Sequence, residues 1–275
     1  MGKTEKNPEG ELSFLDHLEI LRWHLIRSSA AILVGTIVLF SSKSFLFDKV
    51  ILGAKNPEFI TYQWLCALSQ SFGASYFCID SMPFEIINVN MSGQFTTHLW
   101  VSLIGGIVIA FPYILWEIWR FIKPGLKPEE RKNSRGAVAV GSFLFMMGVL
   151  FGYYLISPLS IQFLGTYQVS AEVSNTIHLG SFISTITTVT LASGLIFELP
   201  LMVYFLSRLG ILTSAGMKTY RRHSYVGVLI LSAIITPPDI SSQILVSIPL
   251  VVLYEISIRI AKRVEKKKEK ALKKK

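Results

Sequence analysis

The sequence predicts an all-α polytopic membrane protein with six transmembrane helices, the last two of them short, and with both termini in the cytoplasm. Hydrophobic residues make up 51% of the 275 residues and charged residues only 16%. The mean hydropathy is +0.49, whereas a soluble domain of this length carries far more charge. Four apolar runs come close to or exceed the length of roughly 20 residues that a helix needs to cross a bilayer.

The predicted transmembrane helices cover about residues 25–43, 95–117, 136–157, 181–207, 222–235 and 243–259. The apolar run at residues 225–235 would span only about 17 Å as a helix, well short of a hydrocarbon core of about 30 Å. We therefore expect the last two helices to form a short hairpin that thins the membrane locally or leans on its neighbours. The whole chain, residues 1–275, is expected to form a single membrane domain.

The basic residues alternate between the two sides of this predicted bundle. The segments placed inside hold 24 of the 27 Lys and Arg residues, and they are residues 1–27, 120–135, 208–222 and 259–275. The outer loops at residues 160–180 and 236–242 hold none. The positive-inside rule therefore places both termini in the cytoplasm. The basic tail at residues 262–275 indicates an anchor against anionic lipid, so the net charge of +9 does not call for nucleic acid.

Two features lie outside the predicted helices. Residues 1–11 mix both charges, and no apolar run with a small-residue cleavage site follows closely, so we expect no removable signal peptide. The aromatic-rich outer loop at residues 44–93 is expected to form a structured, partly helical cap. It holds both cysteines, Cys66 and Cys78. They could form a disulfide in an oxidising compartment, but one spacing carries little specificity, so two ordinary buried thiols stay an alternative.

Two acids lie within the apolar runs. Glu198 is the only charged residue in its run, and Pro200 after it removes a backbone hydrogen bond and tends to kink the helix. A carboxylate at membrane depth costs about 2.5 to 3.5 kcal/mol on insertion scales and is a functional candidate by default. The alternative is a protonated Glu198 bonded to a neighbouring Ser or Thr. Glu255 lies nearer the inner end of the last helix, and a structural or snorkelling acid is the better interpretation there.

Two inner segments carry further carboxylates. Residues 121–131 form a tight loop in which prolines and a glycine stiffen the backbone around Glu129 and Glu130. Such a run of charged residues is usually interpreted as a solvent-exposed segment. The stiff backbone, however, suits a loop that holds a carboxylate in a fixed position. Residues 14–27 are amphipathic and predict an interfacial helix that adds Asp16 and Glu19 to the same surface.

Taken together, these segments resemble the TatC family, the core receptor subunits of the twin-arginine protein translocase. The resemblance covers essentially residues 14–263 and rests on four motifs in the right order. They are HLEILR at residues 17–22, FPYILWEIWRFIKPGLKPEER at 111–131, FELP at 197–200 and TPPDISSQILVSIPLVVLYE at 236–255. The resemblance implies no enzyme. It implies recognition of signal peptides with paired arginines and export of folded proteins across the cell inner membrane, driven by the proton-motive force.

The resemblance also implies site residues and partners. The implied signal-binding residues are Glu130, Phe121, His17, Leu18, Glu19 and Arg22. Ile20 stands where such families often have an acid, and Glu19 points about 100° away around the helix. The implied intramembrane or partner-contact residues are Glu198, Gln243 and Asp239, although Asp239 could simply belong to the turn made by the two prolines before it. The implied partners are single-span TatA/TatB-type subunits, twin-arginine precursors, membrane lipid and further copies of the chain.

Two other classes of function fit the sequence less well. A proton-coupled transporter would use Glu198 as the proton carrier, but it needs a polar cavity, and the other helices offer few ionisable residues. An intramembrane hydrolase needs a nucleophile and a base, and no such pair is visible. The sequence has no phosphate-binding loop or zinc motif, and its five histidines are scattered over both faces. We therefore expect no cofactor, no metal and no catalytic residue.

Overall fold

The computed structural model describes residues 14–71, 78, 82, 84–123, 134–170, 172–173, 175–236 and 240–272, with the backbone alone for residues 14–17, 134–135, 240–242 and 270–272. The larger helices are α1 (Phe14–Ser41), α3 (Gly93–Ile122), α5 (Ser134–Phe151), α7 (Leu179–Ile196), α8 (Leu199–Leu209), α10 (Arg221–Ile235) and α11 (Ile240–Leu272). The smaller elements are η1 (Phe45–Ile51), η2 (Leu52–Lys55), α2 (Ile60–Ser71), η4 (Gly152–Ile156), α6 (Ser157–Thr166), α9 (Ser214–Thr219), and strands β1 (Glu85–Ile87) and β2 (Thr176–His178). The chain is thus mostly helical.

Five helical stretches in the described part of the chain are long and apolar enough to cross a membrane. They are Leu18–Ser41, Gly93–Ile122, Gly136–Thr166, Leu179–Leu209 and Gln243–Glu269. Helix α10 has only 15 residues, about 22 Å at the usual rise, so it is shorter than these five. The apolar surface of the bundle faces outward, as on α1, where Leu33, Val34 and Ile37 are each more than half exposed.

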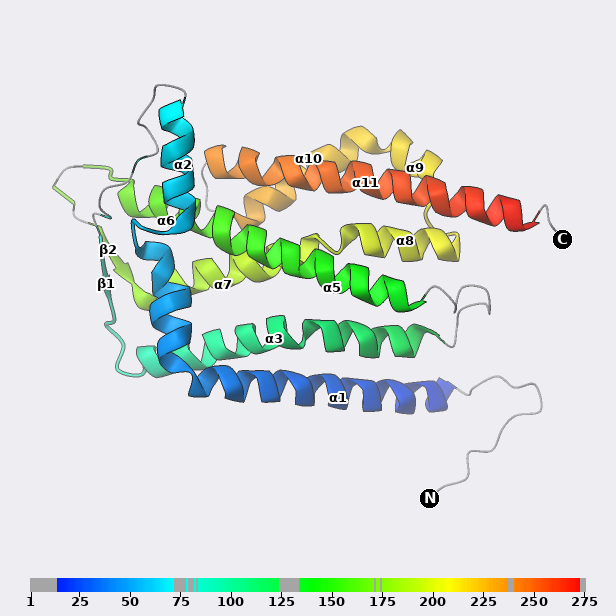
Figure 1. Ribbon diagram of the computed structural model, residues 1–275, viewed down its shortest axis with the longest axis horizontal. Coiled ribbons are helices and arrows are strands. Elements are labelled where there is room, and N and C mark those ends of the chain that lie inside the picture. Colours follow the sequence, from blue (N-terminus) through cyan, green and yellow to red (C-terminus); the bar gives the residue numbers. More distant parts are fainter. Residues whose placement is uncertain are drawn as a thin grey trace, which may run out of the picture.

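The long helices lie roughly side by side and define two ends (Figure 1). The first residues of α1 and the last residues of α11 lie at one end, which we call the terminal end, together with α9. The other end carries η1, η2, α2, α6 and the two strands, and we call it the cap end. Helix α1 packs along α3, α3 along α5 and α7, and α8 along α11.

Small residues set the close approach of these helices. A Cβ atom on Gly35 of α1 would lie 3.1 Å from the Cα of Gly106 in α3, and one on Gly106 would lie 2.9 Å from the carbonyl oxygen of Ile32. Likewise, a Cβ on Gly148 of α5 would lie 2.9 Å from the Cα of Gly194 in α7. Backbones approach this closely where Gly removes the side chain between them, as is common between membrane helices.

The cap is attached to the bundle by buried hydroxyl groups. Tyr62 of α2 is 1% exposed, and its hydroxyl reaches the carbonyl oxygens of Ala54 at 3.1 Å and Pro158 at 3.0 Å. The Tyr153 hydroxyl donates to the carbonyl of Val50 at 2.6 Å. Burial raises the pKa of Tyr62, which keeps its hydroxyl a proton donor. The described elements between the first two predicted spans, η1, η2 and α2, are therefore folded against the bundle.

The structure differs from the predicted elements at three places. Helix α1 is continuous from Phe14, so the amphipathic segment and the first span form one helix. Helix α11 continues to Leu272, past the end of the apolar pattern at residue 259, because Lys, Glu, Ala and Leu favour helix even without burial. The strands β1 and β2 pair in parallel, with Ile86 opposite Ile177, although strands of three residues have no reliable sequence signal.

The close contact of α1 and α3 makes a testable prediction. Gly106→Ala forces a methyl group against the backbone of Ile32 and Thr36, and such overpacking costs about 1 to 3 kcal/mol. We expect a lower Tm in detergent. Gly227→Ala in α10 is the matched control, because a Cβ there meets nothing within 4 Å. Equal Tm values for both variants would contradict the close α1–α3 packing.

Candidate functional site

The predicted signal-binding residues that are described lie on α1 and α3 at the terminal end. Leu18 is 45% exposed, Glu19 and Arg22 are exposed, and Phe121 is half-buried near the end of α3. His17 lies in α1, but its side chain falls outside the described part, and Glu130 lies outside the described residues altogether. Because α1 and α3 pack along each other, the two helix ends that carry these residues are neighbours.

A buried polar network joins the same two helices. Glu117 of α3 is 1% exposed; one carboxyl oxygen accepts a hydrogen bond from the Tyr113 hydroxyl at 2.9 Å. Its other oxygen pairs with Nδ1 of His24 on α1. The edge of the His24 ring meets Phe121, with the ring centroids 6.0 Å apart. Removing one partner of a buried ion pair costs about 3 to 5 kcal/mol, so this network is a strong local constraint.

Sequence reasoning missed this network. Glu117 is the last residue of the predicted span 95–117, directly after the apolar run ends at Trp116, so it is not singled out, and His24 is read as one of five scattered histidines. One signal was available, because the motif WEIWRF places a single acid among aromatic residues just inside the membrane limit. An acid there needs a buried partner or access to water.

Glu198 lies at the break between α7 and α8, and its side chain is 7% exposed. Pro200 lacks the N–H that would continue the helix, and the chain turns at Phe197 and Glu198 instead. Among the described residues, the only polar group against the carboxyl is the backbone amide of Phe145, and no hydrogen bond of good geometry reaches either oxygen. The alternative of a bond to a neighbouring Ser or Thr hydroxyl is therefore not supported.

A groove of about 580 Å³ runs beside this break. Its lining residues come from α5, α8 and α11 and are Gly136, Ala137, Val140, Leu144, Pro200, Leu201, Tyr204 and Ile260. A Cβ on Gly141 would lie 3.2 Å from a carboxyl oxygen of Glu198. The missing side chain at Gly141 therefore lets the carboxyl lie directly against α5, next to an apolar groove.

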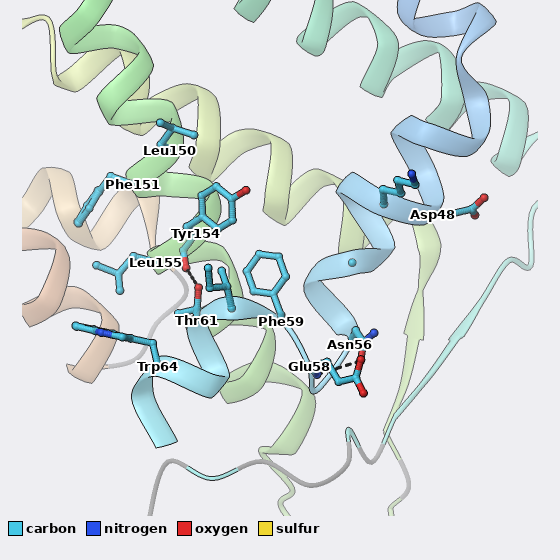
Figure 2. A pocket seen from close by; sticks show the side chains of 13 residues that line it. Asp48, Asn56, Glu58, Phe59, Thr61, Trp64, Leu150, Phe151, Tyr154 and Leu155 are labelled. Atoms are coloured by element: carbon cyan, nitrogen blue, oxygen red, sulfur yellow. Dashed lines mark hydrogen bonds between the residues drawn. The ribbon is translucent and has the colours of Figure 1, made fainter. Parts of the chain in front are cut away.

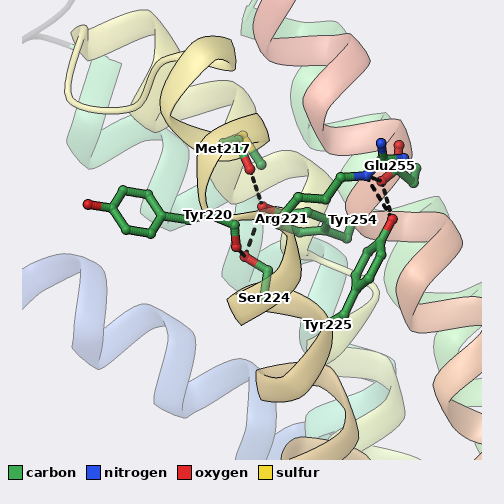
Figure 3. A network of polar contacts seen from close by, with 7 residues as sticks. All are labelled: Met217, Tyr220, Arg221, Ser224, Tyr225, Tyr254 and Glu255. Atoms are coloured by element: carbon green, nitrogen blue, oxygen red, sulfur yellow. Dashed lines mark hydrogen bonds and ion pairs between the residues drawn. The ribbon is translucent and has the colours of Figure 1, made fainter.

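Glu255, by contrast, is fully paired (Figure 3). Its Oε1 accepts from Arg221 Nε at 2.6 Å and from the Tyr225 hydroxyl at 2.6 Å. The neighbouring Tyr254 hydroxyl donates to the carbonyl of Met217 at 2.8 Å and accepts from the Ser224 hydroxyl at 2.8 Å. These bonds join α9 and α10 to α11, so Glu255 has the structural role that the sequence suggests.

At the cap end, the predicted residues do not converge on one site. Gln243 donates to the Leu229 carbonyl at 3.3 Å and so links α11 to α10, while Asp239 lies outside the described residues. Cys66 and Cys78 are joined in a disulfide. A separate groove of about 920 Å³ lies between α2 and η4, where Thr61 bonds the Tyr154 carbonyl and Phe59 stacks on the Tyr154 ring (Figure 2).

The described residues contain no group of three or more His, Cys, Asp or Glu side chains that could hold a metal ion. The ionisable side chains gather instead in pairs between helices, as in His24 with Glu117 and Arg221 with Glu255. Such pairs connect helices. Glu19, by contrast, is an exposed acid at the terminal end and can contact a ligand there.

Comparison with known proteins identifies the relatives of this chain. The family model described as Sec-independent protein translocase protein (TatC) matches residues 16–249. The Sec-independent protein translocase protein TatC of Blattabacterium sp. subsp. Periplaneta americana is 42% identical over 265 residues, 96% of this chain and 100% of the relative. That of Carboxydothermus hydrogenoformans is 32% identical and covers 93% of this chain and 95% of the relative.

Solved structures agree with the sequence relatives. A crystal structure of the twin-arginine translocase receptor TatC aligns with a TM-score of 0.69 and 30% sequence identity, and the alignment covers 90% of this chain and 99% of that chain. A second crystal structure of that receptor, in DDM, gives the same TM-score over 89% of this chain. The likeness therefore extends over nearly the whole fold and is not confined to one motif.

The isolation of Glu198 makes a prediction about stability. Glu198→Met replaces an unpartnered buried carboxyl by an apolar side chain of similar volume, so we expect the Tm in detergent to rise or stay level. Glu255→Met removes a paired carboxyl and is expected to lower the Tm by the equivalent of about 1 kcal/mol or more. A clear drop in Tm for Glu198→Met would show that this carboxyl stabilises the fold.

Proposed function

Because the chain belongs to the TatC family, the non-enzymatic receptor subunits of the twin-arginine translocase, we propose that its terminal end binds twin-arginine signal peptides. We propose further that the chain is a core component of the machinery that exports folded proteins across the cytoplasmic membrane, driven by the proton-motive force. The observation that carries the proposal is the pairing of α1 and α3, which brings the ends bearing Glu19 and Phe121 together.

The chemistry of the peptide supports this location. A guanidinium group is a planar fork that a carboxylate accepts through two parallel hydrogen bonds, so two adjacent arginines require well-placed acids. We assign Glu130 and Glu19 as these acids. Phe121, His17, Leu18 and Arg22 would shape the surface around them. The exposure of Glu19 and Leu18 on one end of α1 is consistent with access from water.

We propose six crossings with both termini in the cytoplasm, with α10 as the short fifth crossing and α11 as the sixth. The basic residues favour this arrangement through the positive-inside rule, and the first residues of α1 and the last residues of α11 lie at the same end of the bundle. Alkaline phosphatase fused after Lys275 is therefore expected to be inactive in cells, while the same enzyme inserted after Tyr167 is expected to be active. Activity of the first fusion would contradict the proposed orientation.

The second part of the proposal concerns Glu198. A buried carboxyl without a good hydrogen bond, next to an apolar groove, suits contact with a polar group on a single-span helix that packs there. We propose that TatA/TatB-type subunits supply this helix and that Gln243 and Asp239 contribute to partner contact at the cap end. Further copies of the chain and membrane lipid would complete the assembly.

A transporter that uses Glu198 as a proton carrier has less support. A proton path needs a chain of polar or ionisable groups. In the described part of the chain, neither carboxyl oxygen of Glu198 has a hydrogen-bond partner of good geometry, and the groove beside it is mostly apolar. Contact with a partner helix explains the isolated carboxyl better.

Site-specific photocrosslinking tests the proposed receptor site. With a photoreactive phenylalanine analogue in place of Phe121, which leaves Glu19 and Glu130 intact, precursors with an Arg-Arg signal are expected to crosslink, and precursors with Lys-Lys are not, because an ammonium group lacks the guanidinium fork. A photoreactive residue at position 227 of α10 is the control and should label neither. Equal labelling of the two precursors from position 121 would remove the reason for assigning Glu19 and Glu130.

The proposed roles of the two sites can be separated in one variant. Glu198→Met is expected to crosslink the Arg-Arg precursor from position 121 as the parent does, but to lose export in membrane vesicles by about tenfold or more, because the partner helix loses a polar contact. Export and crosslinking are measured on the same vesicles. Loss of crosslinking would place Glu198 in the recognition site instead.

A further inference from the structure

The polar network between α1 and α3 carries an inference beyond the proposed receptor site, on which it rests. We propose that Glu117, His24 and Tyr113 are positioning residues, which hold the terminal end of α1 against Phe121 and so build the peptide-binding surface. They act through Glu19 and Leu18 and do not touch the peptide. The observation behind this proposal is that the network joins the terminal half of α1, through His24, to the buried Glu117 of α3.

The burial of α1 is strongly uneven along its length. Of the described side chains at positions 18–34, none is buried, and the first buried residue of α1 is Gly35. These 17 residues span about 25 Å of helix. Among the described residues, the only α1 member of the hydrophobic clusters in the bundle is Leu39, toward the cap end. Apolar packing of the terminal half of α1 therefore rests on half-buried side chains such as Ile20, Leu21 and Ile32, and on no fully buried one among those described.

The polar network holds the terminal half of α1 in place against α3. The Tyr113 hydroxyl, one turn before Glu117 on the same helix, fixes one carboxyl oxygen at 2.9 Å and so selects the direction of the Glu117 side chain. The other oxygen meets His24 from α1. A buried polar pair tolerates few arrangements, because any shift leaves a charged group without a partner. The pair therefore sets both the distance and the rotation of α1 relative to α3.

The network also contacts a residue of the proposed peptide-binding surface. His24 also meets the edge of the Phe121 ring, which belongs to the implied binding set. Arg22 and Glu19 precede His24 by about 3 Å and 7.5 Å along the helix axis. Fixing the rotation of α1 at His24 therefore fixes the directions in which Glu19 and Arg22 point, which is the geometry that bidentate recognition of a guanidinium requires.

The other charges near the network do not replace it. Arg27 of α1 acts on Glu117 through space, but no described hydrogen bond joins the two side chains. Arg120 of α3 lies over the Trp116 ring at 5.5 Å on its own helix. Within the described residues, His24–Glu117 is therefore the one ion pair that connects α1 to α3.

The experiment measures position and capture separately in the full-length chain. Spin labels at Leu18→Cys and Leu209→Cys report the distance from the end of α1 to the end of α8 by double electron–electron resonance, without peptide. The native cysteines are bonded to each other and do not take the label. Capture of a fluorescent Arg-Arg signal peptide is measured by anisotropy on the unlabelled variants.

Three variants decide the outcome. Glu117→Met removes both hydrogen bonds, and we expect a broadened distance distribution and capture weakened about tenfold, because the surface is no longer preorganised. Glu117→Gln can keep both bonds without the charge, and we expect a narrow distribution and capture within about threefold of the parent. Glu255→Met breaks a similar network elsewhere and should leave both readouts unchanged.

Other results would overturn the inference. A narrow distribution in Glu117→Met shows that the network does not position α1. Equal loss of capture in Glu117→Gln and Glu117→Met, with narrow distributions, shows that Glu117 acts by its charge on the peptide. If the parent chain captures no Arg-Arg peptide, the proposed function fails, while the distance measurements still decide whether the network positions α1. If Glu117→Met does not accumulate, Tyr113→Phe removes one of the two bonds and should broaden the distribution.

Discussion

A carboxyl group inside an apolar bundle costs free energy unless it has a polar or charged partner, and the rest of the structure depends on this constraint. Three carboxyls in the described part of the helices have different surroundings. Glu117 is paired across α1 and α3, Glu255 is paired across α10 and α11, and Glu198 has neither a charged partner nor a good hydrogen bond. The first two connect helices. The third is stabilised by nothing that the described residues provide, and so is best explained by a partner from outside the chain.

The two ends of the bundle differ in their chemistry. At the terminal end, charged residues of α1 and α3 are exposed, which suits the proposed recognition of a charged peptide. At the cap end, buried tyrosine hydroxyls and a disulfide hold short elements over the helices. Between the two ends lies the break at Glu198 with its groove. In the proposed function, recognition and assembly therefore occupy separate levels of the bundle.

Much of the fold could be predicted from sequence, because apolar length and the distribution of Lys and Arg are direct consequences of the bilayer. The family, the mainly helical fold and the long apolar spans were predicted and are confirmed. The continuation of α11 to Leu272 was not predicted, because hydropathy does not report a helix that leaves the membrane. The pairing of β1 with β2 joins residues about 90 positions apart, and strands this short carry no pattern.

The site was less accessible to sequence reasoning. Glu198 could be singled out because a lone acid in an apolar run is conspicuous, and Glu255 could be interpreted as structural. Glu117 lies one residue beyond its apolar run, and its partner His24 is 93 positions away, so their pairing depends on the register of α1 against α3. No local pattern encodes that register. It follows from the glycines at positions 35 and 106, whose role becomes visible only in the packed helices.

The central claim is that fixed carboxylates at the terminal end bind a pair of guanidinium groups. The most direct measurement is the affinity of an Arg-Arg signal peptide for the purified chain and for the double variant Glu19→Gln/Glu130→Gln, at two salt concentrations. The account predicts that the double variant binds at least about a hundredfold more weakly and loses most of the salt dependence. Unchanged affinity in the double variant would contradict it.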